Sequence, residues 1–452
     1  MNQKTNIHIH NPIHILIILL LSNPFHPKFV KPCHPIDKQA LLAYKHGITN
    51  DAVPDSGYKL LHTWLPKTNC CTWEGIGCNR RNGRVNKLSM PNFPDSPFLS
   101  SSSTPLVGTI SPFLGNLTYL ETLNLGGSLN LTGPIPSEIG KLSNLIFLSL
   151  SSNQLIGSIP NSLGNLHNLD TLDLSENKLS GKIPIGIRKL QKLSTLFLSS
   201  NNFEGSIPEF IGDLSQLYYL YLVNNNLSGP IPSSIGKLSR LNTLFLSNNQ
   251  ISGSIPSSIG RLVSLENFWV SHNKLTGVLP DSIGNLTRIQ KILLDNNMIM
   301  GKIPGSFGNL KSLSSLDLSN NLFVGPIDES IMGKNNQLIE TLILSNNPLG
   351  GSIPKSIGNL RQLERLEMEN NGLSGGIPEE IGDAKKLTTI VLSSNSLNGE
   401  IPAKVFELEN LIVFDVSRNN LVGKIPQHKM MIPASSFSGN SGLCGDPLPP
   451  CK

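Results

Sequence analysis

The chain repeats itself every 24 residues over most of its length, and this period constrains the fold more than any other feature. The unit reads LSLSSNQLIGSIPNSLGNLHN from Leu148 and LDLSENKLSGKIPIGIRKLQK from Leu172. A fixed period of about 20 to 50 residues indicates a solenoid whose units stack on one another. One asparagine marks the register, at Asn153, Asn177, Asn201, Asn225, Asn249, Asn273, Asn297 and Asn321, and, after a two-residue insertion near residues 333–337, at Asn347, Asn371, Asn395 and Asn419.

Each unit begins with the pattern L-x-x-L-x-L, which predicts a short β-strand. Successive side chains of a strand point to opposite faces, so Leu148 and Leu150 are expected to point inward while Phe147 and Ser149 face solvent. One such strand from every repeat would stack into a parallel sheet. The outward positions of all repeats are therefore expected to collect on one face of the molecule.

The remainder of each unit predicts a tight turn, a second short strand and a helical or 3₁₀ turn. The recurring asparagine follows the first strand, where its amide can satisfy backbone groups that the turn leaves in the core. The L-x-G-x-I-P segment combines a glycine bend with a proline that ends strand pairing. The S-x-I-G-x-L segment then buries residues such as Ile235 and Leu238. These features predict an α/β repeat fold: a right-handed curved solenoid with a parallel concave sheet, short convex turns and disulfide-capped ends.

The cysteines lie only near the two ends of the chain, at Cys33, Cys70, Cys71 and Cys78 and at Cys444 and Cys451. Terminal repeats expose one face of the core, and an oxidised chain can close that face with disulfide-stapled caps. Cys70 and Cys71 are adjacent and would bridge each other only with strain. The favoured pairing is therefore Cys33–Cys70, Cys71–Cys78 and Cys444–Cys451, although the sequence leaves other pairings open.

The apolar run IHILIILLL at residues 13–21 is too short to span a bilayer and is interpreted as a secretory signal peptide. No later segment approaches the roughly 18 consecutive apolar residues that a membrane span requires. The protein is therefore expected to be secreted, to the extracellular space or cell wall, or to be held at the plasma membrane by a partner.

Charge and motif content exclude several classes of function. The net charge is only +5 and the basic residues are scattered singly, so nucleic acid is not an expected partner. The sequence has no nucleophile elbow, zinc-protease motif, phosphate-binding loop or paired C-x-x-C. Asp295 and Asp317 could form a carboxylate pair, but nothing in the sequence argues for an enclosing pocket. We predict a binding protein rather than an enzyme, with no cofactor and no metal.

The full unit L-x-x-L-x-L-x-x-N-x-L-x-G-x-I-P resembles the plant-specific class of extracellular leucine-rich repeats. DKQALLAYKHGI, Trp64 and NCCTWEGIGC at residues 69–78 resemble the N-terminal cap of that class, and SFSGNSGLCGDPLPPC resembles its C-terminal cap. On this resemblance the chain divides into a signal peptide at residues 1–25, an N-terminal cap at 26–82, about 13–14 leucine-rich repeats at 83–430 and a C-terminal cap at 431–452.

Members of this family include polygalacturonase-inhibitor-like wall proteins, receptor-like proteins and receptor-kinase ectodomains, which bind proteins, peptides or glycans through the strand face. The resemblance implies an extracellular ligand-binding protein of plant defence or cell-surface signalling, with a membrane receptor kinase as a further partner. The alternatives are an inhibitor of polygalacturonase-type wall hydrolases and a structural wall protein. The inhibitors tend to have a polar, charged concave surface, whereas the centre of this one is aromatic.

The position between the last two strand leucines is the one to examine for a ligand, because its side chain varies without harm to the core. At a strand spacing of about 4.8 Å, five consecutive apolar residues would form an exposed stripe close to 20 Å long, beside Tyr219 and Asn267. Exposed apolar patches usually mark interaction sites, although cross-strand stacking that only stabilises the sheet is an alternative. The five residues are Phe197, Tyr221, Phe245, Trp269 and Leu293.

Polar residues are expected around and beyond this stripe. Ser199, Ser247, Asn248 and Ser271 offer hydrogen bonds, and His272 is expected at the rim. In the C-terminal half, acidic residues outnumber basic ones, so a partner that contacts both halves should present an apolar knob beside a basic patch. The predicted ligand-binding residues are Phe197, Tyr219, Tyr221, Phe245, Trp269, His272, Leu293, Asp295, Asp317, Glu367 and Glu369.

Four N-x-S/T sequons occur, at Asn116, Asn130, Asn226 and Asn285. Asn116 and Asn285 lie in G-N-L-T segments on the expected convex turns, where a glycan would be solvated and would leave the concave face open. They are the stronger candidates. Asn130 and Asn226 lie close to the asparagine turn and are the weaker ones.

Overall fold

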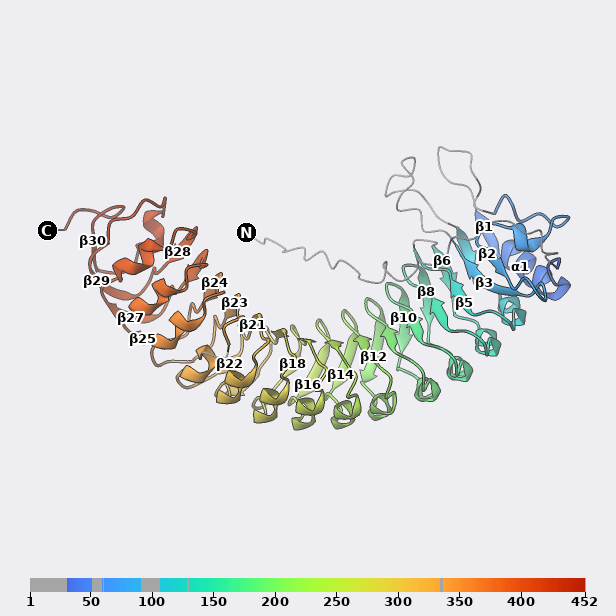
Figure 1. Cartoon of the computed structure of the whole chain (residues 1–452), viewed down its shortest axis with the longest axis horizontal. Coiled ribbons are helices and arrows are strands. Elements are labelled where there is room, and N and C mark those ends of the chain that lie inside the picture. The colour runs from blue at the N-terminus through green and yellow to red at the C-terminus, as the bar shows by residue number, and fades with distance from the viewer. Residues whose placement is uncertain are drawn as a thin grey trace.

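The computed structural model describes residues 31–50, 59, 61–90, 106–127, 130–333 and 336–451. The signal peptide expected at residues 1–25 lies outside these ranges. The repeats stack side by side into a long arc, with the N-terminal cap at one tip and the C-terminal end at the other (Figure 1). Helical turns follow the outer edge of the arc, which gives the solenoid a convex and a concave side. None of the helices in the described ranges has the length and apolar character needed to cross a membrane.

The first strand of each repeat enters one long sheet, as the L-x-x-L-x-L pattern predicts. Within the described ranges this sheet has 15 strands, and only β2 and β3 pair antiparallel. Equivalent residues face each other, as Phe197 faces Tyr221, so each side-chain column runs straight across the concave face. The strands are β2 (Ile76–Cys78), β3 (Val85–Ser89), β5 (Thr122–Asn124), β7 (Phe147–Ser149), β9 (Thr171–Asp173), β11 (Thr195–Phe197), β13 (Tyr219–Tyr221), β15 (Thr243–Phe245), β17 (Asn267–Trp269), β19 (Lys291–Leu293), β21 (Ser315–Asp317), β23 (Thr341–Ile343), β24 (Arg365–Glu367), β26 (Thr389–Val391) and β28 (Val413–Asp415).

The expected second strand is present in most repeats of the described ranges, although not in the repeat that contains Pro348, and it builds shorter sheets along one flank of the solenoid. In the described part of the chain these flank sheets have nine, two and four strands. The nine are β1 (Ile48–Asn50), β4 (Val107–Thr109), β6 (Leu131–Gly133), β8 (Gln154–Gly157), β10 (Lys178–Gly181), β12 (Asn202–Ser206), β14 (Asn226–Gly229), β16 (Gln250–Gly253) and β18 (Lys274–Leu275). The others are β20 (Met300–Gly301) with β22 (Leu322–Phe323), and β25 (Ser374–Gly375), β27 (Ser396–Gly399), β29 (Asn420–Lys424) and β30 (Gly442–Cys444).

The convex side consists of 3₁₀ turns, one per repeat, that pack turn against turn. Ile235 and Leu238 are buried there, as expected. The glycine of each S-x-I-G motif is required by this packing: a Cβ on Gly260 would clash with the carbonyl oxygen of Ser282 in the next turn. The turns are η3 (Pro112–Asn116), η4 (Ser137–Lys141), η5 (Asn161–Asn165), η6 (Ile185–Lys189), η7 (Glu209–Asp213), η8 (Ser233–Lys237), η9 (Ser257–Arg261), η10 (Asp281–Asn285), η11 (Gly305–Asn309), η12 (Glu329–Met332), η13 (Lys355–Asn359), η14 (Glu379–Asp383), η15 (Ala403–Glu407) and η16 (Ala434–Phe437).

The recurring asparagine links neighbouring repeats through backbone hydrogen bonds, as its position in the sequence predicts. In Asn201, the side-chain oxygen accepts a bond from Leu179 N at 3.0 Å, and the amide nitrogen donates to Leu174 O at 2.9 Å. The same nitrogen reaches the carbonyls of Leu198 and Ser199. One buried amide therefore bonds to four backbone groups of two adjacent repeats, and its three carbonyl partners each accept a second bond, from Asn177, Asn225 or Glu176 N.

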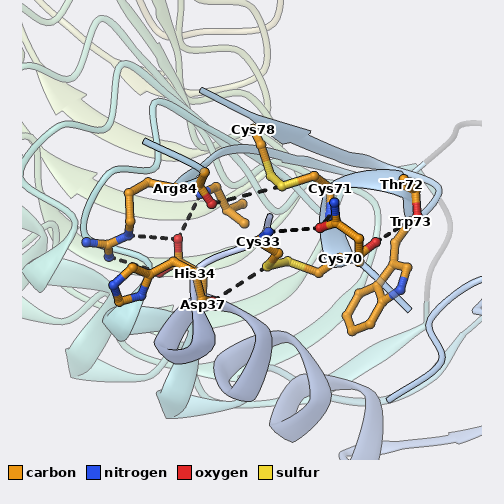
Figure 2. Close-up of a disulfide and its surroundings, with 12 residues drawn as sticks. Cys33, His34, Asp37, Cys70, Cys71, Thr72, Trp73, Cys78 and Arg84 are labelled. Carbon is orange, nitrogen blue, oxygen red and sulfur yellow. Dashed lines mark hydrogen bonds and ion pairs between the residues drawn. A yellow bond between two sulfur atoms is a disulfide. The ribbon is translucent and has the colours of Figure 1, made fainter. Parts of the chain in front are cut away.

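The N-terminal cap combines two disulfides with a buried ion pair. Helix α1 (Pro35–His46) and turn η2 (Cys70–Thr72) are joined through Cys33–Cys70, and Cys71–Cys78 closes a small loop. Figure 2 shows Asp37 beside these bridges, with the Arg84 guanidinium directed at its carboxylate. Both contacts from Arg84 measure 2.9 Å, and Val85 N also donates to Asp37 at 2.8 Å.

The C-terminal end is closed by the third disulfide, Cys444–Cys451. The three bridges are those that the adjacency argument favoured, and none of the cysteines in the described ranges is free. Strand β30 pairs with β29, so the last bridge fixes the chain directly against the final repeat. Both ends of the core are thereby covered, as a stacked repeat array requires.

Candidate ligand-binding face

Four aromatic rings on the concave sheet stack face to face across four strands. The centroid separations are 4.4 Å for Phe197 and Tyr221, 4.6 Å for Tyr221 and Phe245, and 3.9 Å for Phe245 and Trp269. The interplanar angles are 24°, 23° and 13°. The first two separations are close to the spacing of adjacent strands, about 4.8 Å, and the third is shorter. We call these four residues the aromatic stack.

Stacking turns the ring faces toward one another and leaves the ring edges toward solvent. Phe245, in the middle, is only 6% exposed, although it does not belong to the aliphatic core. The expectation of an exposed stripe is therefore wrong for Phe245, because the rings on either side cover both of its faces. Phe197, Tyr221, Trp269 and Leu293 are half-buried. The stack presents a ridge of edges rather than a broad apolar surface.

Two further tyrosines extend the aromatic surface at one side of the stack. Tyr219 lies edge-on to Tyr221, with centroids 6.0 Å apart, and Tyr218 lies edge-on to Tyr219 at 4.7 Å. The sequence analysis missed Tyr218, which precedes the strand and falls outside the alternation that was used to find outward positions. Burial raises the pKa of Tyr221 to about 12, and the neighbouring Tyr219 adds to this effect. Burial also raises the pKa of Tyr219, so the Tyr219 and Tyr221 phenols remain neutral hydrogen-bonding groups near neutral pH.

The carboxylate of Asp295 lies just after the strand next to that of Trp269, and it contacts several polar side chains. Asp295 accepts hydrogen bonds from the Ser271 hydroxyl and from the Asn296 amide, the latter at 2.7 Å. The His272 imidazole lies 3.5 Å from the same carboxylate and is exposed, which agrees with a rim position. The indole nitrogen of Trp269 is buried and has no hydrogen-bond partner in the described part of the chain. The end of the stack thus carries a buried donor without a partner.

Asp317 continues the column that the aromatic stack begins. Its neighbours in register are Leu293 and Ile343, and these aliphatic side chains limit its access to water. Burial raises the pKa of Asp317 to about 6, and the negative charges of Asp295 and Glu367 also raise it, while hydrogen bonds from Ser319 oppose the shift. The carboxylate is charged above this pH and neutral below it.

Beyond the stack the column alternates between aliphatic and acidic residues. The order in register is Leu293, Asp317, Ile343, Glu367, Val391 and Asp415. Glu367 forms an ion pair with Arg365, with 2.6 Å between their oxygen and nitrogen atoms. Burial raises the pKa of Glu369, and the negative charges of Glu367 and Asp415 raise it further. The predicted residues therefore form one continuous strip with an aromatic half and an acidic half.

The sequons and cysteines lie away from this strip. Asn116 and Asn285 are exposed at the ends of convex turns η3 and η10, and Asn130 and Asn226 are exposed beside or within flank strands β6 and β14. In the described ranges the one cluster of potential metal ligands is Cys33, Cys70 and Cys71, whose sulfurs are held in disulfides. These sulfurs are therefore not free thiolates that could bind a metal ion.

Comparison with known protein families decides the classification. A family model described as a leucine-rich repeat region matches residues 100–225 and 204–342. The chain belongs to the leucine-rich-repeat family. A leucine-rich-repeat N-terminal domain matches residues 34–79, and single leucine-rich repeats match 338–360 and 362–384.

Two curated relatives of this leucine-rich-repeat protein are plant proteins. A polygalacturonase inhibitor from Vitis vinifera is 34% identical over 137 residues, which cover 30% of this chain and 35% of the inhibitor. The receptor-like protein EIX2 from Solanum lycopersicum is 34% identical over 150 residues, which cover 32% of this chain and 14% of EIX2. The chain thus spans only about a third, or less, of the length of these relatives.

Solved structures extend the likeness over most of the chain. The plant peptide hormone receptor RGFR1, in complex with RGF2, aligns with a TM-score of 0.72 at 36% identity, covering 79% of this chain and 62% of the receptor chain. The PEPR1–AtPEP1 complex aligns with a TM-score of 0.76 at 31% identity, covering 90% and 59% respectively.

Proposed function

We propose that this leucine-rich-repeat protein is secreted and binds an extracellular peptide or protein on its concave face, in plant defence or cell-surface signalling. The observation that carries the proposal is the continuous strip from the aromatic stack to Asp295 and Asp317. It joins apolar ring edges to carboxylates on one accessible face. The likeness to a peptide hormone receptor structure supports a peptide as the ligand.

The orientation of the rings favours a peptide or protein over a glycan. The faces of Tyr221 and Phe245 are used within the stack, so a sugar ring has no broad aromatic face on which to lie. The rim of an aromatic ring is the positive end of its quadrupole, and it packs well against aliphatic groups, carbonyl oxygens and the faces of other rings. A side chain of a peptide offers these groups.

The acidic half of the strip supports a ligand with a positive charge beside its apolar group. Asp317 and Glu369 have no ion-pair partner within the described residues, whereas Glu367 is already matched by Arg365. A Lys or Arg side chain would supply the missing charge. The ligand is thus a peptide with an apolar residue followed by a basic one, and catalysis has no part in this function.

Tryptophan fluorescence tests this function directly, because Trp64 and Trp73 are buried in the cap and Trp269 lies on the strip. The probes are synthetic peptides that place Phe or Leu beside Arg, and matched peptides with Glu in place of Arg. We expect a saturable change with the Arg peptides only. Equal titrations with both sets, or none with either, would contradict the proposal.

A triple variant, Tyr221→Ala, Phe245→Ala and Trp269→Ala, tests the aromatic half of the strip. Phe113→Ala, Ile185→Ala and Val263→Ala together form the matched control, because these three exposed side chains lie on the convex turns or immediately after one. Affinity capture from extracellular fluid should recover partners with the wild type and the control but not with the stack variant. Circular dichroism checks that both variants are folded, and Trp269→Ala alone serves as the milder variant.

Inhibition of a wall hydrolase is a second candidate, favoured by the identity to polygalacturonase inhibitors. It requires the same concave face to cover an enzyme surface. Residual polygalacturonase activity, measured with and without the purified protein, tests this candidate. Full activity at a large molar excess of the protein excludes it for the enzyme tested.

A further inference from the structure

One flank of the solenoid carries an aliphatic stripe that the concave site does not involve. Val278 pairs with Met300 through an isolated bridge, and Met300 pairs in register with Leu322 of β22. The three side chains are 59%, 45% and 48% exposed. We call them the flank stripe, and Met298 and Val324, each 42% exposed, lie beside it.

The flank stripe departs from the pattern of the other repeats. Met300 and Leu322 face each other on adjacent flank strands. In most other pairs of adjacent flank strands the two residues at these positions are polar. A stripe of exposed aliphatic side chains adds little to the stability of the core, so its concentration on three successive repeats indicates an interaction site. The polar equivalent pairs are Thr132 with Gln154, Ser180 with Asn202, Glu204 with Asn226, Ser228 with Gln250, Ser252 with Lys274, Ser374 with Ser396, and Asn398 with Asn420, whereas Ile156 faces Lys178.

The flank sheet is interrupted immediately after the stripe. Leu322 N donates to Ile299 O at 2.8 Å and joins β22 to the preceding repeat. In the next repeat the equivalent residue is Pro348, which has no N–H to donate. Gly350 N instead bonds to Asn371 O. Among the described residues no flank strand therefore follows β22 directly, and the two-stranded sheet of β20 and β22 ends there (Figure 1).

The charges around the stripe indicate what covers it. The outward flank positions of these three repeats hold Lys274 and Lys302 and no carboxylate. Neither lysine forms an ion pair within the described ranges, and Lys274 Nζ donates a hydrogen bond to the Gln250 amide oxygen at 3.2 Å. A second copy of the chain would bring two more lysines and no countercharge, so the surface does not fit itself.

We propose that the flank stripe docks a partner protein through an aliphatic surface bordered by Asp or Glu residues. The aliphatic groups of the partner cover Val278, Met300 and Leu322, and its carboxylates face Lys274 and Lys302. This contact is separate from the concave strip, so the protein can hold a ligand on one face and a second protein on its flank.

Methyl NMR of the full secreted chain, labelled at the methionine methyl groups, tests this contact. Met298 and Met300 report on the stripe, while Met431, which is 99% exposed, reports on non-specific association. The probes are a synthetic peptide with consecutive Leu and Ile residues flanked by Asp, the same peptide flanked by Lys, and a scrambled Asp peptide. We expect saturable chemical-shift changes of the Met298 and Met300 methyl groups with the first peptide alone. The affinity that these changes report should be at least tenfold weaker at high salt.

A paired set of variants makes the test specific. Val278→Ser with Leu322→Asn restores residues typical of other repeats and should weaken binding of the Asp peptide at least tenfold. Ile156→Ser with Val422→Ser removes exposed aliphatic residues from distant flank strands and should leave binding unchanged. Parallel movement of Met431, equal binding of the Lys peptide, or absence of any shift overturns the proposal. Concentration-dependent dimerisation without peptide, seen by sedimentation, also overturns it by identifying a second copy as the occupant.

Discussion

The rings of Phe245 and Trp269 lie face to face, with their centroids 3.9 Å apart and their planes 13° from parallel. Each ring covers part of the other, so the same contact that shapes the proposed binding strip also stabilises the sheet. Recognition and folding are consequently coupled at this pair. A substitution here has to be tested for both effects before a loss of binding is interpreted.

Replacing the central ring should lower stability measurably. Phe245→Ala removes two stacking contacts and opens a gap on the concave face, and we expect a loss of about 2 kcal/mol in the free energy of unfolding. Phe113→Ala, on the convex side, should change it by less than about 0.5 kcal/mol. Urea denaturation monitored by circular dichroism measures both. An equal effect of the two changes would show that the stack contributes nothing beyond ordinary surface contact.

The asparagine that links the repeats should be far less tolerant than its neighbour. Asn201→Ala removes the acceptor of Leu179 N and one of the two donors to each of three backbone carbonyls, and it should cost about 1–3 kcal/mol. Asn202→Ala is the control, because Asn202 is exposed. Native-state hydrogen exchange should show local opening of the repeats around Asn201 only. Similar exchange in both variants would refute the structural role.

Binding of a basic peptide should depend on pH through Asp317. Burial raises the pKa of its carboxyl to about 6, so the carboxylate is fully charged above that value and neutral well below it. Affinity for an Arg-containing peptide is therefore expected to fall as the pH drops through about 6. Calorimetric titration between pH 4.5 and 8 measures this. Asp317→Asn should flatten the profile, and an unchanged profile in that variant would exclude Asp317 as the cause.

The raised pKa of Asp317 also affects stability, and there the charged carboxylate is unfavourable, whereas for peptide binding it is favourable. A carboxyl whose pKa is higher in the folded than in the unfolded state destabilises the fold when it is ionised, so its cost is complete above about pH 6 and disappears as the pH falls toward its ordinary value of 3.8. Asp317→Asn should thus stabilise the protein at pH 7.5 more than at pH 4. Denaturation at the two pH values compares them, and a variant less stable than the wild type at pH 7.5 contradicts the assignment.

The buried ion pair of the N-terminal cap should be sensitive to loss of one partner. Asp37→Ala leaves Arg84 and Val85 N without their acceptor, and we expect a cost of about 3–5 kcal/mol, confined at first to the cap. Fluorescence of the buried Trp64 and Trp73 follows cap unfolding under urea. Asp281→Ala, at an exposed carboxylate of a convex turn, is the control. A cap as stable as the wild type would show that the disulfides alone hold it.

Much of the fold could be predicted because the sequence of each repeat contains the local signals for its strands and turns. The spacing of Leu148 and Leu150 predicts the inward face of a strand, and the proline and glycine that follow predict where strands end. The same unit recurs with one register, so a secondary-structure prediction made for one repeat applies to the others. The pairing of Cys70 and Cys71 with different partners follows from their adjacency alone.

Properties that depend on neighbouring repeats could be predicted only in part. The sequence places Phe245 and Trp269 on one outward column, yet only the structure shows that their rings lie flat against each other and bury Phe245. The flank stripe was missed because the residues that form it, Val278, Met300 and Leu322, come from three repeats and occupy different positions within each. The pairing of Asp37 with Arg84, 47 residues apart, has no local signal at all.

The sequence by itself determined the repeat, its strand and turn positions, the buried leucines and the capped ends, because those depend on side-chain periodicity within 24 residues. Tertiary structure decided which outward side chains are covered, which carboxyl has its pKa raised, and where the flank sheet is interrupted beside an aliphatic stripe. The physical reason is that burial, stacking and charge interaction are set by the distance between atoms of adjacent repeats, and side-chain orientation across a sheet is not encoded in the period.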